Sequence, residues 1–100
     1  MFDRSKITRE LSHPGEILKD IYIADTPGLT QQKLAYALGV SFRTINQICN
    51  KHRGVTPEVA VRLAKYFNTS PELWLNLQMS YDLQKAERTV DVSNIKPMAV

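Results

Sequence analysis

The sequence predicts an all-α fold, and three observations support this class. Apolar residues recur at spacings of three and four along most of the chain, as they do on one face of a helix. A helix-start formula, in which a hydroxyl residue precedes a proline and an acid, occurs twice. Residues 30–50 contain two short helical patterns around a glycine. We therefore expect a domain of five helices at residues 13–88, with an arm at residues 1–12 and a tail at residues 89–100.

The first predicted helix begins at Pro14, because the missing N–H of proline costs nothing in a first helical turn. Glu16 suits the positive N-terminal end of a helix. Apolar residues then recur at helical spacing, namely Ile17, Leu18 and Ile21. The turn-forming run at residues 26–28 should end this helix.

The next two helices are predicted on either side of Gly39, which suits the left-handed position at a helix C-terminus. Thr30 can cap the first of them and Ser41 the second, because each hydroxyl can accept a bond from a free backbone N–H. Ala35 is small enough to let the two helices approach closely. This combination is typical of a helix-turn-helix, whose second helix enters the major groove of DNA.

The second helix of this pair has two different faces. Its apolar stripe, at positions i, i+3 and i+4, consists of Ile45, Ile48 and Cys49. At 100° per residue, the other side carries polar side chains, namely Arg43, Asn46, Gln47 and Asn50. We expect the stripe to pack in the core and the polar face to read DNA.

The distribution of charge agrees with this interpretation. Residues 26–57 contain basic side chains but no Asp or Glu, although the formal net charge of the whole chain is only +3. A basic, acid-free segment over a helix-turn-helix pattern predicts a surface for phosphates. The alternative is an ordinary solvated surface with an uneven distribution of charges.

Arg43 is the strongest candidate for a base contact, because its guanidinium matches the two acceptors of guanine, a pairing worth roughly 1–3 kcal/mol of discrimination. Gln47 can pair with adenine, and Thr44 or Asn46 could reach bases or phosphates. Phe42 could contact a thymine methyl, but packing against the core is its favoured role. The full set of predicted DNA contacts is Gln31, Gln32, Lys33, Ser41, Phe42, Arg43, Thr44, Asn46, Gln47, Asn50, Lys51, His52 and Arg53.

The last two helices should begin at the repeated formula, at residues 56–58 and 70–72. The fourth should end near Asn68 and the fifth near Arg88. The residues that follow are more strand-prone than helical, and they predict either a flexible tail or a short edge strand.

The fifth helix is apolar on two sides. Trp74, Leu77 and Tyr81 share one side, and a second stripe lies opposite, consisting of Leu75, Met79 and Leu83. A helix at the edge of a small domain needs only one buried stripe. We predict that the second stripe is a homodimer interface, because a helix-turn-helix reads two half-sites through twofold symmetry. A cover formed by the arm or the tail of the same chain is the alternative.

Other chemistry is not indicated. Cys49 and His52 lie three residues apart, but a structural zinc site needs four ligands and the remaining histidine is His13. No phosphate-cradling glycine loop or recognisable oxyanion loop occurs, so we expect neither a cofactor, a metal nor an enzyme activity. No window resembles a membrane span or a signal peptide, which predicts a cytoplasmic protein without a membrane partner.

The chain resembles the HigA-type antitoxins, a branch of the Cro/C1 (Xre-like) helix-turn-helix family, in three runs: HPGEIL at 13–18, TQQKLAYALGVSFRTINQICN at 30–50 and TSPELWLNLQMSYDLQKAE at 69–87. The resemblance implies a five-helix domain that dimerises and binds a palindromic operator in double-stranded DNA at its own promoter. It also implies a protein partner, a HigB-type mRNA-cleaving toxin that the antitoxin neutralises.

Among related repressors, residues 41–44 and Gln47 correspond to base-reading positions, and Gln31 corresponds to a phosphate-binding one. Phe42 departs from the polar residue common in relatives. The first alternative function is a free-standing repressor without a toxin. The second is a protein-interaction module that retains the fold without binding DNA, although an acid-free outer face argues against it.

Overall fold

The computed structural model describes residues 10–99, which are helical except for short connections and the two ends. The helices are α1 (Pro14–Ile17), η2 (Leu18–Ile23), α2 (Gln31–Leu38), α3 (Phe42–Cys49), α4 (Pro57–Phe67) and α5 (Pro71–Thr89). Because η2 is a π-helical continuation of α1, the two form one helical segment. The described part of the chain therefore has five helical segments and no strand, as the sequence predicts.

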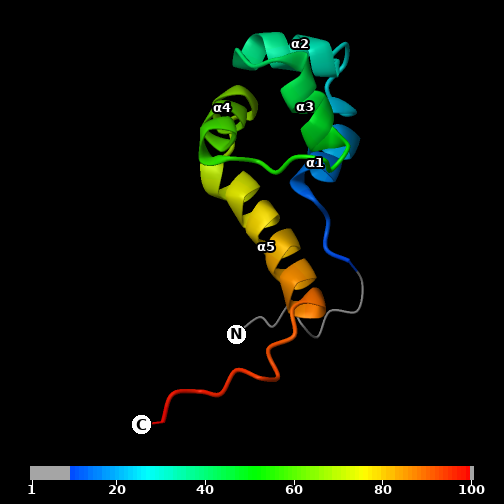
Figure 1. The fold of residues 1–100 in the computed structure, drawn as a ribbon. Helices are drawn as coiled ribbons and strands as arrows, with labels where there is room; N and C mark the ends of the chain where they lie inside the picture. The colour runs from blue at the N-terminus through cyan, green and yellow to red at the C-terminus, as the bar shows by residue number, and fades with distance from the viewer. Residues whose placement is uncertain (1–9, 100) are drawn as a thin grey trace.

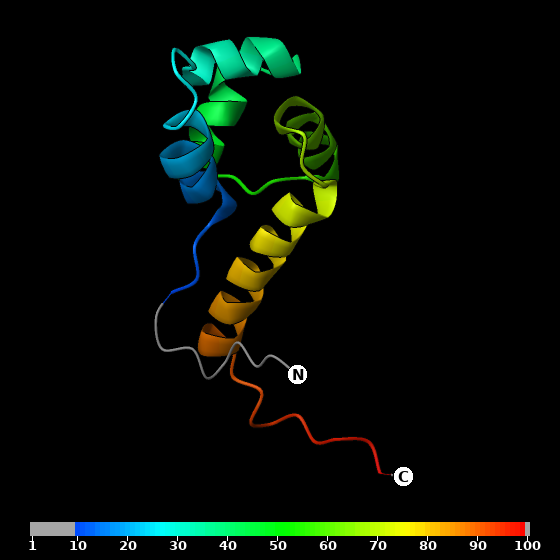
Figure 2. The same ribbon diagram turned by 180° about the vertical axis from the view of Figure 1, so that it is seen from behind.

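The five segments surround one core (Figure 1). Helix α2 lies across one end of the molecule, α3 and α1 lie together on one side, and α4 lies on the other. Helix α5 runs from α4 toward the opposite end, and its last turns extend beyond the other helices in both views (Figure 2). The chain leaves α5 after Thr89, and residues 90–99 form no strand. Most of the predicted arm, residues 1–9, lies outside the described residues.

The core combines side chains from every segment. Its largest fully buried apolar side chains are Leu18, Leu34, Ile45, Ile48, Leu63 and Trp74. Tyr22 closes the core on one side, with its ring centroid 4.9 Å from those of both Phe67 and Trp74. None of the helices in residues 10–99 is long and apolar enough to span a membrane.

The predicted helix starts are confirmed by their caps. Four hydroxyl groups accept a hydrogen bond from the backbone N–H three residues later, those of Thr30, Ser41, Thr56 and Ser70. Helix α4 ends at Asn68, which takes the left-handed conformation (φ 55°). These bonds satisfy N–H groups that would otherwise have no partner at the helix starts.

Two apolar side chains of the helical patterns are exposed. Ile21 is 48% exposed, because a π-helical turn closes with a wider spacing than an α-helical one and brings Tyr22 and Ile23 to the core instead. Phe42 is 50% exposed at the first position of α3. The favoured role of Phe42 in core packing was therefore wrong, since Phe42 is neither in the core cluster nor among the partly buried residues packed against it.

Candidate nucleic-acid interface

Helices α2 and α3 form the predicted helix-turn-helix. Gly39 follows α2 with φ 73°, a left-handed conformation that favours glycine, and its backbone N–H bonds the carbonyls of the last turn of α2. Ser41 then caps α3 by accepting from the N–H of Thr44 at 3.1 Å. The connection between the two helices is therefore as short as the motif requires, and Phe42 and Arg43 at the start of α3 are exposed.

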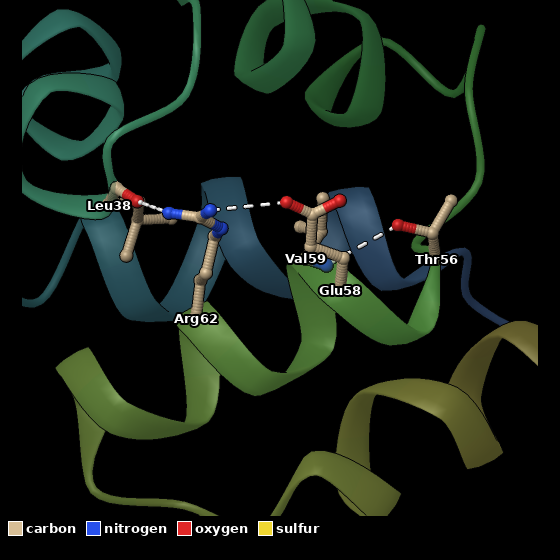
Figure 3. Close-up of polar contacts among 5 residues, drawn as sticks. All are labelled: Leu38, Thr56, Glu58, Val59 and Arg62. Carbon is tan, nitrogen blue, oxygen red and sulfur yellow. Dashed lines mark hydrogen bonds and ion pairs between the residues drawn. The ribbon is translucent and has the colours of Figure 1, made fainter.

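Arg62 of α4 fixes this turn from below (Figure 3). Its Nη1 donates to the carbonyl oxygen of Leu38 at 2.7 Å, and its Nη2 contacts Oε1 of Glu58 at 3.1 Å. The carbonyl of Leu38 lies at the C-terminal end of α2, where a cation is favourable. The sequence did not predict this contact, because nothing in the local pattern places Arg62 beside Leu38, which is 24 residues away in the chain.

Helix α1 fixes the other end of α3. Gly15 lies so close to α3 that a Cβ atom there would overlap the carbonyl oxygen of Ile48. His13 is buried, caps α1 by accepting from the N–H of Gly15 at Nδ1 (2.8 Å), and meets the ring of Tyr81 edge to face. Burial lowers the pKa of His13 below its usual 6.5, against the opposing effect of Asp82. The HPGE run at residues 13–16 thus packs against the C-terminal end of α3 and holds it in place.

None of the thirteen predicted DNA contacts is buried, and they gather on α2, on α3 and on the loop that follows α3. The predicted inner stripe of α3 is confirmed, since Ile45, Ile48 and Cys49 are at most 4% exposed. Arg43 is exposed and Gln47 is half-buried on the outer side. Within residues 10–99, neither side chain has a hydrogen-bond or carboxylate partner, so both are available to a ligand.

Other side chains on this surface bind one another. Asn46 donates from Nδ2 to Oε1 of Gln31 at 3.0 Å and accepts at Oδ1 from Asn50 at 3.2 Å. The first bond links α3 to α2 across the outer face, and the second links α3 to its own C-cap residue. Both polar ends of Asn46 are engaged, so base reading by Asn46 would require them to break, whereas the amide nitrogen of Gln31 is left to donate.

The start of α3 carries a second small network. The hydroxyls of Ser41 and Thr44 are 2.9 Å apart, and Nη1 of Arg53 donates to Oγ1 of Thr44 at 3.1 Å. Arg53 belongs to the loop between α3 and α4, so this bond places the basic loop beside the first turn of α3. The contact supports a role for Thr44 in positioning Arg53.

The cations of the acid-free segment differ in their partners. Lys51 forms an ion pair with Glu16 of α1, with 3.0 Å between Nζ and Oε1. Lys33 donates from Nζ to the carbonyl oxygen of Gly28 at 3.1 Å. No carboxylate within residues 10–99 lies in ion-pair range of Arg43, His52 or Arg53. The acid-free composition of residues 26–57 did not predict the pair with Glu16, because this carboxylate lies outside that segment in the chain.

Two glutamine side chains of α5 bind backbone groups of distant segments. Oε1 of Gln78 accepts from the N–H of Val55 at 2.8 Å, which anchors the end of the α3–α4 loop. Gln84 is buried, and its Oε1 accepts from the N–H of Leu11 at 2.7 Å. This bond ties the end of the predicted arm to α5. Buried amides need partners, and these bonds provide them where the sequence shows no apolar pattern.

The opposite side of α5 is partly exposed among the residues that the structure describes. Met79 is 50% and Leu83 37% exposed, while Leu75 is partly buried against the core. No segment within residues 10–99 covers Met79 or Leu83, so the described tail does not provide the alternative cover.

The described residues contain no group of three or more His, Cys, Asp or Glu side chains that could hold a metal ion. Cys49 is buried on the inner stripe of α3, and this burial raises the pKa of its thiol to about 11. The thiol is therefore protonated at neutral pH and packs as a small apolar group.

Comparison with known proteins agrees with this geometry. A helix-turn-helix family model matches residues 27–74. Virulence-associated protein I of Dichelobacter nodosus is 45% identical over 83 residues, which cover 83% of this chain and 76% of that protein. Antitoxin GraA bound to its operator superposes with a TM-score of 0.83 at 36% identity, covering 95% of this chain and 97% of GraA. Pseudomonas aeruginosa antitoxin HigA with the higBA promoter gives a TM-score of 0.79 at 35% identity, covering 89% and 99%.

Proposed function

Since the chain belongs to the Xre-like helix-turn-helix family, in the branch of the HigA-type antitoxins, we propose that it is an antitoxin that binds an operator at its own promoter. The observation that carries this proposal is the outer face of α3, where Arg43 and Gln47 are accessible and have no partner within residues 10–99. The proteins GraA and HigA, each bound to its DNA, support the same placement of the motif.

In the proposed complex, the first turns of α3 enter the major groove. Arg43 donates to the two acceptors of a guanine, and Gln47 pairs with an adenine on the same side. Phe42, which is half-exposed at the start of α3, is positioned for contact with a thymine methyl. The remaining members of the set bind phosphates or support those that do, through Gln31, Gln32 and Lys33 on α2 and through Lys51, His52 and Arg53 on the loop.

The DNA-binding proposal is tested with a duplex that carries the promoter upstream of the gene and with a scrambled duplex of equal length. Fluorescence anisotropy at several salt concentrations gives both affinities and the specificity ratio. We expect the promoter to bind at least about 10³-fold more tightly than the scrambled duplex at physiological salt. Equal affinity for the two duplexes would contradict sequence-specific binding and leave only an electrostatic surface.

We also propose that two copies bind together through Leu75, Met79 and Leu83 on α5. An exposed apolar stripe on a helix that extends from the domain supports this assignment, because such a stripe is unfavourable in water. A twofold dimer would place two copies of α3 about one helical turn of DNA apart, so the operator should be palindromic.

The second activity that we propose is neutralisation of a HigB-type mRNA-cleaving toxin through a protein complex. Both the operator and mRNA lie in the cytoplasm, which is where such a protein would act. The test is co-expression of this chain with the neighbouring open reading frame, followed by pull-down and a growth assay. Growth arrest by the neighbour alone, relieved by this chain in a stable complex, is the expected result. A harmless neighbour that forms no complex would instead favour a free-standing repressor.

A further inference from the structure

The ion pair between Glu16 and Lys51 joins α1 to the basic loop beside the proposed DNA surface. Lys51 follows the C-cap residue Asn50, and its Nζ lies 3.0 Å from Oε1 of Glu16. Hydrogen bonding to this carboxylate raises the pKa of Lys51, because the partner stabilises the charged ammonium. The pair is half-exposed, with 41% of the Lys51 side chain and 36% of the Glu16 side chain accessible to solvent.

The backbone holds both partners in place. Lys51 takes a left-handed conformation (φ 62°) that is costly for a residue with a Cβ. Its N–H donates a hydrogen bond to the carbonyl oxygen of Ile48 at 3.0 Å, and the N–H of His52 donates to the carbonyl oxygen of Gln47 at 2.8 Å. Glu16 is held by its neighbour Gly15, which lets α1 meet the carbonyl of Ile48. The close contact between Gly15 and Ile48 therefore also places the carboxylate of Glu16 beside Lys51 in the α3–α4 loop.

The loop is also adjacent to the outer face of α3. Asn50 bonds Asn46 on that face, and Arg53 bonds Thr44 at its start, so Lys51 lies between two residues that touch the proposed DNA surface. A phosphate that approaches Lys51 meets the carboxylate of Glu16 as a competitor for the ammonium.

We propose that Glu16 is a positioning residue that limits DNA affinity by holding the Lys51 ammonium away from phosphate. This inference rests on the proposed DNA binding and deepens it. Glu16 lowers the affinity for operator and unrelated duplex alike, because the contact it withholds is made to the sugar–phosphate backbone and carries no sequence information. The acid on α1 thus tunes the general affinity, and the outer face of α3 sets the preference among sequences.

The test compares the wild type with Glu16→Gln in anisotropy titrations on promoter and scrambled duplexes across a salt series. One additional phosphate contact should steepen the salt slope by about 0.9 and tighten binding about fivefold at 0.15 M salt. The gain should be equal for both duplexes, so that the specificity ratio does not change. An unchanged slope, or a gain confined to the promoter, would overturn the proposal.

Two further variants separate this mechanism from a general effect of charge. Glu72→Gln changes the net charge equally at another helix start, where the exposed carboxylate has no cation in ion-pair range within residues 10–99. It should leave the slope unchanged, and a slope as steep as that of Glu16→Gln would overturn the proposal. The double variant Glu16→Gln/Lys51→Ala should match Lys51→Ala alone, whereas a remaining gain would show that Glu16 acts through another group.

Should Glu16→Gln impair folding, Lys51→Gln in the wild-type background tests the proposal from the other partner. If Glu16 already withholds the ammonium, this change should flatten the salt slope by clearly less than 0.9, the approximate value for one phosphate contact. A full loss of 0.9 would overturn the inference while leaving DNA binding intact. A wild-type protein that binds neither duplex would overturn the proposed function as well.

Discussion

Helices α3 and α5 both carry an apolar stripe, but within residues 10–99 the chain covers only the first. The stripe of α3 is almost fully buried, and α1 crosses it with a backbone-to-backbone contact at Gly15. The outer stripe of α5 leaves Met79 half-exposed, and no segment within residues 10–99 covers it. The difference indicates that contacts among the described residues decide the position of α3, whereas the same residues leave the outer side of α5 uncovered.

Breaking the cover of α3 should have the largest effect. Gly15→Ala places a methyl group on the carbonyl oxygen of Ile48, which is backbone and cannot rotate away. We expect the free energy of unfolding to fall by roughly 4 kcal/mol or more, because α1 must separate from α3. Thermal and urea unfolding measure this loss.

Gly28→Ala is the matched control for this change. Gly28 has a positive φ of 76°, unlike the helical Gly15, and an added Cβ there meets nothing within 4 Å. The cost should therefore be about 1–2 kcal/mol, from backbone conformation alone. Equal losses for the two variants would mean that the crossing at Gly15 is not a close contact.

Met79→Glu tests the uncovered stripe of α5. A carboxylate buried without a partner in a dimer interface should cost roughly 3 kcal/mol of association free energy, while the fold of the protomer is retained. Sedimentation should then report a monomer with unchanged helical circular dichroism. Val61→Glu changes an exposed apolar residue of α4 in the same way and should leave the dimer intact. A Met79→Glu protein that still sediments as a dimer would place the interface elsewhere.

Arg43→Ala removes a side chain from the face of α3 that packing does not use. We expect no change in unfolding free energy and a loss of about 1–3 kcal/mol at one base position in each half-site. Affinity for a panel of operator variants measures the loss. Lys65→Ala removes an exposed cation from the last turn of α4 and should weaken all duplexes slightly without changing base preference. An unaltered base preference in Arg43→Ala would remove Arg43 from the reading surface.

The smallest expected effect is a pH dependence of the free energy of unfolding, caused by His13 at the start of α1. Burial lowers the pKa of His13, so below the ordinary value of 6.5 the unfolded chain binds the proton more readily than the folded one. The free energy of unfolding should therefore fall as the pH decreases from 6.5, and His13 should add no pH dependence above that value. The carboxylates of Asp82 and Glu16 oppose this effect, and Lys51 adds to it.

His13→Asn keeps a capping acceptor but does not titrate, so it should abolish this part of the pH dependence. His52→Gln changes the exposed histidine and should preserve it. Urea unfolding between pH 5 and pH 8 distinguishes the two variants. Identical pH profiles for wild type and His13→Asn would show that the buried cap is not the titrating group.

Local patterns in the sequence were sufficient for the elements themselves. The caps at Thr30 and Ser41, the glycine at position 39 and the apolar stripe of α3 depend on neighbours within a few residues. Helix formation is decided over that distance, because its hydrogen bonds join residues four apart. The exposed side of Arg43 follows from the same periodicity.

Contacts between distant segments were decided by tertiary structure. The pairing of Glu16 with Lys51, the brace from Arg62 to Leu38 and the bond from Gln84 to Leu11 join residues that no local pattern relates. The favoured core role of Phe42 was wrong for the same reason, since hydrophobicity by itself does not place a side chain against the core. Sequence alone thus determined which helices form and which face of α3 is polar. Packing determined which charges remain available on that face, because the partners of a side chain depend on where the chain returns in space.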